Sequence, residues 1–156
     1  MHSRIYQVSF EPVEEFINEF RYHSNFVPSV ADYVVKQETE EQIREDLEWL
    51  AQATKGIEVD VENKTIKIVS KEEYFKGMHE KFVKLAEELS TITLEEFVND
   101  KSYFKFYDLK SAYEDRHSFY IDDNDENIGY APIDTWIRHT EDGEVYYIGS
   151  IFDYHF

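Results

Sequence analysis

The densest group of oxygen ligands in the chain partly follows the pattern of a calcium-binding loop. Asp123, Asp125 and Asn127 occupy positions 1, 3 and 5 of that pattern, and Asp134 occupies position 12. Position 6 requires Gly because the loop turns sharply there, but this chain has Ile128. We therefore interpret the segment as a charged turn and expect no bound metal. The alternative is a metal site formed by Asp123, Asp125, Asn127 and Asp134.

Other catalytic chemistry needs residues that the chain lacks or does not group in a motif. The absence of Cys excludes thiolate catalysis and Cys-ligated metals. The six His form no H-E-x-x-H motif, and neither G-x-S-x-G nor a glycine-rich nucleotide loop is present. Asp115 with His117, and Asp153 with His155, could share a strand face. We expect a protein that is not an enzyme and has no cofactor; the alternative is an enzyme or metal-binding domain whose site assembles only in three dimensions.

Three acids indicate another kind of chemistry, the recognition of a positively charged partner. Glu41, Glu45 and Glu48 are spaced i, i+4, i+7 and share the face opposite the apolar stripe of a predicted helix. At a rise of about 1.5 Å per residue, the outer two lie roughly 10 Å apart. Such a row can imitate the spaced phosphates of DNA. The alternative is a solvated acidic surface that keeps the protein soluble.

Acidic residues also gather in the C-terminal third of the chain. The whole chain has 34 Asp and Glu against 16 Lys and Arg, a net charge of −18. Such a surface repels phosphate backbones and anionic membranes and attracts basic clefts. Tyr130 and Trp136 lie among these acids and are residue types that interface hot spots favour. The acids of this region that we predict to bind a partner are Asp122, Asp123, Asp125, Glu126, Glu141, Asp142 and Glu144.

Helices are predicted where a capping pattern precedes apolar residues spaced at helical intervals. Capping boxes stand at residues 39–42, 70–73 and 93–96. They predict a helix that ends near Ala53, a helix of about 18 residues, and a short helix that turns Leu94, Phe97 and Val98 inward. Residues 13–20, which follow Pro12, predict a further short amphipathic helix.

Strands are predicted from alternation and turn residues. Residues 4–10 alternate, and residues 57–69 predict a hairpin that turns at Asn63-Lys64 with Asp60 opposite Lys67. Residues 27–37 fit either a helix or a strand. The chain becomes aromatic from residue 103, and Asp142-Gly143 is a favourable hairpin turn between its last two strands. The strand candidates of this region are 103–107, 118–121, 129–139 and 145–156.

This order of elements predicts an α+β fold. We expect an antiparallel sheet of about five to seven strands, mostly connected by hairpins, packed with three or four helices. Residues 1–156 are expected to form a single domain, in which the acidic and aromatic β part begins at about residue 103.

Composition also predicts where the protein acts. No apolar run approaches the ~18 residues of a transmembrane helix. Residues 1–10 lack a signal-peptide pattern, and the absence of Cys fits a reducing compartment. We therefore expect a cytoplasmic protein that does not enter a membrane.

The chain is similar in size, acidity and aromatic content to two groups of proteins. The first is the phage or mobile-element proteins that mimic DNA and inhibit restriction, CRISPR or repair enzymes. The second is the bacterial immunity proteins that neutralise nuclease toxins. Either similarity implies a basic, nucleic-acid-binding protein as the partner, with no direct contact to nucleic acid. A structural or assembly subunit is a further alternative, and the sequence leaves the oligomeric state open.

Overall fold

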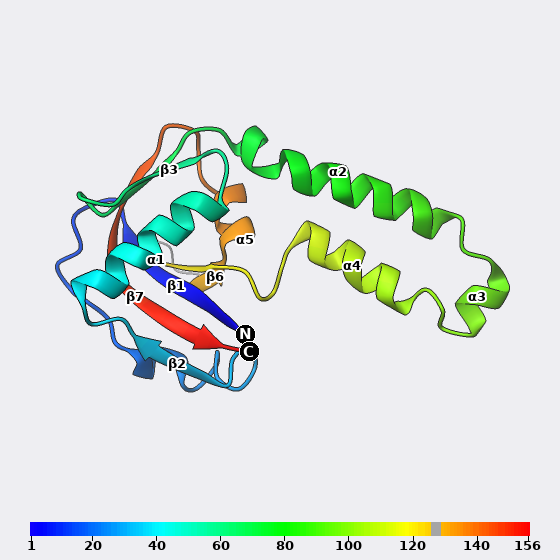
Figure 1. The fold of residues 1–156 in the computed structure, drawn as a ribbon, viewed down its shortest axis with the longest axis horizontal. Coiled ribbons are helices and arrows are strands. Elements are labelled where there is room, and N and C mark those ends of the chain that lie inside the picture. Colours follow the sequence, from blue (N-terminus) through cyan, green and yellow to red (C-terminus); the bar gives the residue numbers. More distant parts are fainter. Residues whose placement is uncertain (126–128) are drawn as a thin grey trace.

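The computed structural model describes residues 1–125 and 129–156, which form a β-sheet body with helices against it and a helical arm that extends from the body (Figure 1). The predicted α+β class is confirmed, and the sheet is mostly antiparallel. The elements, in chain order, are β1 (His2–Ser9), the 3-10 helix η1 (Glu19–Tyr22), β2 (Tyr33–Lys36), α1 (Glu40–Ala53), β3 (Ile57–Asp60), β4 (Thr65–Ile68), α2 (Lys71–Ser90), α3 (Leu94–Val98), α4 (Tyr103–Tyr113), β5 (Tyr120–Asp123), β6 (Tyr130–Pro132), α5 (Ile133–Arg138) and β7 (Val145–His155).

The sheet is organised around its longest strand, β7. Six of the seven strands of the described residues follow the order β3-β4-β7-β1-β5-β6, and the seventh, β2, pairs with β7 off this path. The pair β1–β5 is parallel, so the sheet is mixed, whereas the other pairs are antiparallel. Because β1 and β7 are neighbours, the two chain ends meet, and the Met1 amino group donates to the Phe156 carbonyl oxygen at 2.6 Å.

Both faces of the sheet are covered. Each strand contributes side chains to both, because successive residues of a strand point to opposite sides. Tyr6 and Val8 pack on the face that α1 and α5 cover, together with Leu47 and Leu50 of α1. Ile5, the neighbour of Tyr6 in the strand, points to the opposite face. Residues 17–31 close that second face, where the fully buried rings are Tyr22, Phe26, Phe152 and Tyr154.

The β3–β4 hairpin forms with a different register from the predicted one. Glu58 lies opposite Lys67, and Asp60 lies opposite Thr65. The turn takes four residues, 61–64, in place of the tight Asn63-Lys64 turn. Asp60 organises this turn, because its carboxylate accepts hydrogen bonds from both the backbone and the side-chain nitrogen of Asn63.

The helix predicted over residues 13–20 is absent from the structure, which has only the short η1 near its end. The backbone there is satisfied by side chains of the sheet instead. Gln7 donates to the Glu15 carbonyl oxygen at 2.8 Å, and Ser150 donates to the Ile17 carbonyl oxygen at 2.9 Å. Residues 27–37, which fitted either element, contain the strand β2.

The aromatic C-terminal third is less β-like than predicted. Residues 103–107 open the helix α4, and only 130–132 of the segment 129–139 is a strand, because α5 follows at Ile133. Asp142-Gly143 does turn the chain, but it connects α5 to β7, and no hairpin forms there. Aromatic residues favour strands on average, yet α4 is helical because α2 offers its apolar face.

The arm consists of residues 71–113, in which α2 and α4 pack side by side and α3 lies at the tip (Figure 1). The short helix α3 forms with the predicted capping box, but Leu94, Phe97 and Val98 do not turn inward: each is at least 68% exposed. Among the described helices, none combines the length and the apolar content needed to cross a membrane.

The arm is attached to the body at its root. Tyr74 of α2 donates to Asp134 of α5 at 2.7 Å, and the Lys71 ammonium donates to the carbonyl oxygens of Arg138 and Thr140. The Arg138 guanidinium lies over the rings of Phe75 and Tyr113, at 4.8 and 4.1 Å from their centroids, and so contacts both helices of the arm.

Candidate functional site

The acidic row of α1, defined as Glu41, Glu45 and Glu48, is displayed as the sequence predicts. Thr39 caps the helix through a complete capping box with Gln42. The opposite side of the helix is buried against the sheet, so the acidic row faces outward and its three side chains are exposed. Only Glu48 has an ion-pair partner within the described residues, the Arg44 guanidinium at 3.6 Å.

The basic residues beside the acidic row are engaged by other carboxylates. Arg44 pairs with Glu62 of the β3–β4 turn, and Lys64 of the same turn pairs with Glu40 at 3.1 Å. These exposed pairs contribute little to stability, because water screens them. Arg44 and Lys64 are thus both paired, whereas Glu41 and Glu45 have no ion pair among the described residues and can accept an external cation.

The acids at 122 and 123 are not part of the exposed surface, which corrects the predicted partner-binding set. Asp122 is fully buried, where it accepts from the Tyr22 hydroxyl at 2.8 Å and pairs with Arg21 at 2.6 Å. Burial and the neighbouring Asp122 carboxylate raise the pKa of Tyr22 above its usual range. Asp122 is thus a hydrogen-bond acceptor of the core.

Asp123 and Trp136 are also buried and bind each other. The Trp136 indole nitrogen donates to Asp123 at 2.8 Å, and its ring packs edge-on against Tyr146. The Tyr146 hydroxyl in turn donates to Glu144 at 2.7 Å. The structure therefore brings three predicted site residues into one chain of contacts, but that chain joins α5 to β5 and β7 and does not present a charged face.

The remaining predicted residues of this region lie in several settings. Asp125 is exposed and accepts from the Phe10 backbone nitrogen at 2.7 Å, and Asp142 accepts from the Lys71 backbone nitrogen at 2.9 Å at the start of α2. Glu141 is exposed, whereas Tyr130 is half-buried against the rings of Tyr22 and Phe26. Glu126 lies outside the described residues.

The alternative metal site does not assemble from the described ligands. Asp134 belongs to the arm root, where it accepts from Tyr74 and from the Asp115 backbone nitrogen. Burial is the main cause of its raised pKa. Asp123 binds Trp136 instead, and Asn127 lies outside the described residues. Across residues 1–125 and 129–156, no group of three or more His, Asp or Glu side chains has the geometry to hold a metal ion.

Neither predicted Asp–His combination forms an ion pair between its two side chains among the described contacts, although the Asp115 carboxylate accepts from the His117 backbone nitrogen at 2.9 Å. Asp153 pairs with His2 of the neighbouring strand at 2.9 Å, whereas His155 pairs with Asp32 at 3.1 Å. The His117 ring stacks on Phe156 at 4.1 Å, and burial lowers its pKa. No hydroxyl nucleophile is hydrogen-bonded to any of these rings among the described contacts.

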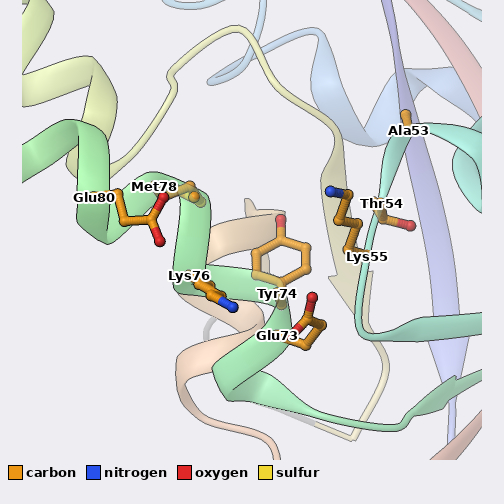
Figure 2. A pocket seen from close by; sticks show the side chains of 9 residues that line it. Ala53, Thr54, Lys55, Glu73, Tyr74, Lys76, Met78 and Glu80 are labelled. Atoms are coloured by element: carbon orange, nitrogen blue, oxygen red, sulfur yellow. The ribbon is translucent and has the colours of Figure 1, made fainter.

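One cavity of about 470 Å³ opens between the end of α1 and the first turns of α2 (Figure 2). Its lining includes two Lys, at 55 and 76, and two Glu, at 73 and 80, so the charges balance. Tyr74, at its centre, already donates to Asp134, and burial raises its pKa above the usual range. The tyrosine is therefore held neutral, and the four charged side chains of the lining leave the cavity without a net charge.

The most extensive exposed feature, which the sequence reasoning missed, is the aromatic face of the arm. We define it as eight apolar side chains of α3 and α4 that are each at least half exposed: Leu94, Phe97, Val98, Tyr103, Phe104, Phe106, Tyr107 and Tyr113. The signal in the sequence is that residues 103–113 carry apolar side chains on several sides of the helix, interspersed with Lys105, Asp108 and Lys110, so that no single apolar stripe can bury them all.

Compared with protein families, with curated proteins and with solved structures, the chain matches none. Function is therefore inferred from the acidic row, the aromatic face and the hydrogen bonds that occupy the other carboxylates.

Proposed function

We propose that the protein is a small acidic binding protein without catalytic activity, which occupies a basic nucleic-acid-binding cleft of another protein. Its contact surface is the acidic row of α1, and its mode of action is the exclusion of DNA or RNA from that cleft. Counter-defence proteins of phages and immunity proteins against nuclease toxins both act in this general way.

The observation that carries this proposal is the exposure of all three side chains of the acidic row on a helix that is itself well anchored. Like charges at these spacings cost a few tenths of a kcal/mol per pair, so the row does not serve the stability of the helix. Their spacing of roughly 10 Å over two turns suits a groove lined with Lys and Arg.

The charge of the whole molecule supports the same partner. With a net charge of −18, the protein attracts a basic surface over a distance and repels the nucleic acid that the surface would otherwise bind. Association steered in this way is fast at low salt and weakens as salt rises.

The test is capture of partners by the immobilised full chain at low salt, followed by elution with duplex DNA. We expect a nucleic-acid-binding protein to be retained, and to be released by DNA because both compete for one cleft. The triple variant Glu41→Gln, Glu45→Gln and Glu48→Gln should bind this partner with an affinity at least about tenfold lower, since exposed ion pairs contribute up to ~1 kcal/mol each.

The matched control removes three exposed acids of α2, which are not part of the acidic row, through Glu73→Gln, Glu80→Gln and Glu87→Gln. Its net charge equals that of the α1 triple variant, so general electrostatic attraction is the same in both. Equal loss in the two variants, or retention that DNA does not reverse, would count against a specific role of the acidic row.

A further inference from the structure

The aromatic face of the arm is larger than a protein that acts alone normally exposes. Its eight side chains are 50% to 78% exposed. Since a large aromatic side chain carries about 150–250 Å² of surface, these eight side chains together expose on the order of 1,000 Å². The largest apolar patch of a typical monomer is roughly 300–600 Å². A stable interface needs about 800 Å² from each partner, so this face alone is sufficient for one.

The helix α4 has the composition of a helix with neighbours on more than one side. Its contact with α2 is made on one side only, where Ala112 is buried and Leu109 is half-buried. Phe104 and Tyr107 lie away from that side and remain 77% and 50% exposed. Folding of one chain thus leaves most of the aromatic surface of α4 in water, which the hydrophobic effect opposes.

The distribution of charge indicates which occupant suits the face. The arm carries seven Lys against nine Asp and Glu, a net charge of −2, and the rest of the chain carries −16 of the total of −18. Two copies repel each other through their bodies but hardly through their arms. A basic partner, by contrast, is drawn to the body and gains little electrostatic attraction from the arm.

The shape of the molecule allows two copies to bury the aromatic face of the arm while their acidic bodies stay apart. The arm extends away from the body (Figure 1), and α2 alone has 20 residues, a length of about 30 Å. Two arms that overlap in opposite directions would keep their bodies several Debye lengths of about 10 Å apart at moderate salt. Four helices would then enclose the aromatic residues, as in an antiparallel four-helix bundle.

We infer that the aromatic face is a homodimer interface: two copies pair through α3 and α4 about a two-fold axis, and the acidic bodies lie at opposite ends. The contact is self-complementary, because each copy supplies the same patch. This inference does not depend on the proposed function, although a dimer would present two acidic rows to its target.

The first test is the mass of the full chain in solution, by light scattering and by sedimentation over a range of concentrations. We expect twice 18.7 kDa for the protein. The double variant Phe104→Glu and Tyr107→Glu should raise the dimer dissociation constant at least about a hundredfold, since aromatic residues dominate interface energies. Both side chains are exposed, so the circular dichroism of the monomer should be unchanged.

The second test uses the absence of native Cys. Phe104→Cys should form a disulfide-linked dimer under mild oxidation, whereas Lys84→Cys, on the exposed outer side of α2, should not. The α1 triple variant should remain dimeric, and the Phe104 and Tyr107 double variant should keep its salt-sensitive capture, so the two proposals fail separately. The inference would be overturned if the protein is a monomer, or if the dimer survives the double variant. Equal cross-linking at both positions would also overturn it, as would a monomer that binds lipid vesicles through the arm.

Discussion

Phe152 of β7 and Phe104 of α4 are residues of the same type in opposite environments. Phe152 is fully buried, with the Tyr22 ring packed edge-on at a centroid distance of 5.1 Å, whereas Phe104 leaves 77% of its surface in water. The difference extends to the regions around them, because the body buries most of its rings and the arm exposes most of its own. The body therefore buries its main core within one chain, whereas the arm would bury its rings only in the dimer that we infer.

The acids show a second contrast, which lies within the body. Asp122 is fully buried and accepts from Tyr22, whereas Glu45 projects from α1 without an ion pair among the described residues. Asp123 and Asp134 are likewise buried and accept hydrogen bonds from Trp136 and Tyr74. A dense acidic stretch of sequence is therefore not the same as an acidic surface: Asp122 and Asp123 are buried, whereas the acidic row of α1 is exposed.

The two phenylalanines give the largest expected effect. Phe152→Ala should cost about 3–5 kcal/mol of unfolding free energy, because it removes a buried ring and leaves a cavity. Phe104→Ala should cost less than about 0.5 kcal/mol at low protein concentration, as for other exposed sites. Denaturant unfolding at two protein concentrations measures both.

The dependence on protein concentration separates a ring that stabilises the dimer from a ring that stabilises the core of one chain. A ring that stabilises only the dimer matters more as protein concentration rises, because association shifts apparent stability by mass action. The loss for Phe104→Ala should therefore grow with concentration, and the loss for Phe152→Ala should stay constant. Equal, constant losses would show that the arm is a second core and not an interface.

The elements that the sequence predicts well are those with a local signal. The helix α1 carries its capping box, its apolar stripe and its outward acids within residues 39–54, so each could be placed before the structure was known. The strand β7 was recognisable as a long alternating segment. The α+β class follows from such segments alone.

The errors arise where distant residues decide the outcome. The backbone of residues 13–17 bonds to Gln7, which is eight residues from Glu15, and to Ser150, which lies far away in the sequence. Residues 103–113 are helical against α2, although their aromatic composition favours a strand. Burial of Asp122 depends on Arg21 and Tyr22, about a hundred residues earlier, and nothing in its neighbours along the chain indicates it.

The glycines give the next effect in size, at the junction between body and arm. Gly56 has φ of +70°, and a Cβ there would lie 2.2 Å from the Ser70 carbonyl oxygen, in the turn that starts α2. Gly56→Ala should therefore cost more than about 2 kcal/mol, since the left-handed conformation alone costs roughly 1–2 kcal/mol for a residue with a side chain.

Gly143→Ala is the matched control for this junction. Gly143 also has a positive φ, of +95°, but a Cβ there would meet nothing within 4 Å. Its loss should be limited to the backbone strain, about 1–2 kcal/mol. The difference in unfolding midpoints between the two variants isolates the close contact at the root of the arm. If both variants lose the same stability, that contact is easily relieved and the arm is less firmly attached than the structure indicates.

The smallest expected effect is on the pH dependence of stability, through two carboxylates whose pKa values shift in opposite directions. Burial raises the pKa of Asp134, so ionisation opposes folding at that site. Its contribution to stability is complete below the unfolded pKa and is lost as pH rises through the folded pKa. Hydrogen bonds from the Asn63 side chain and backbone lower the pKa of Asp60, so its contribution is present at neutral pH and is lost on acidification.

Substitution by Asn separates the two cases, because Asn does not titrate. Relative to the unmodified protein, Asp134→Asn should lose less stability between about pH 4 and pH 7, a range that begins near the ordinary pKa of Asp. Asp60→Asn should lose less when the pH falls below about 4. The slope of unfolding free energy against pH is the readout, since a lost hydrogen bond shifts the whole curve and leaves its slope unchanged. An unaltered slope for Asp134→Asn would mean that water reaches the root of the arm, and that the junction opens more readily than the body it joins.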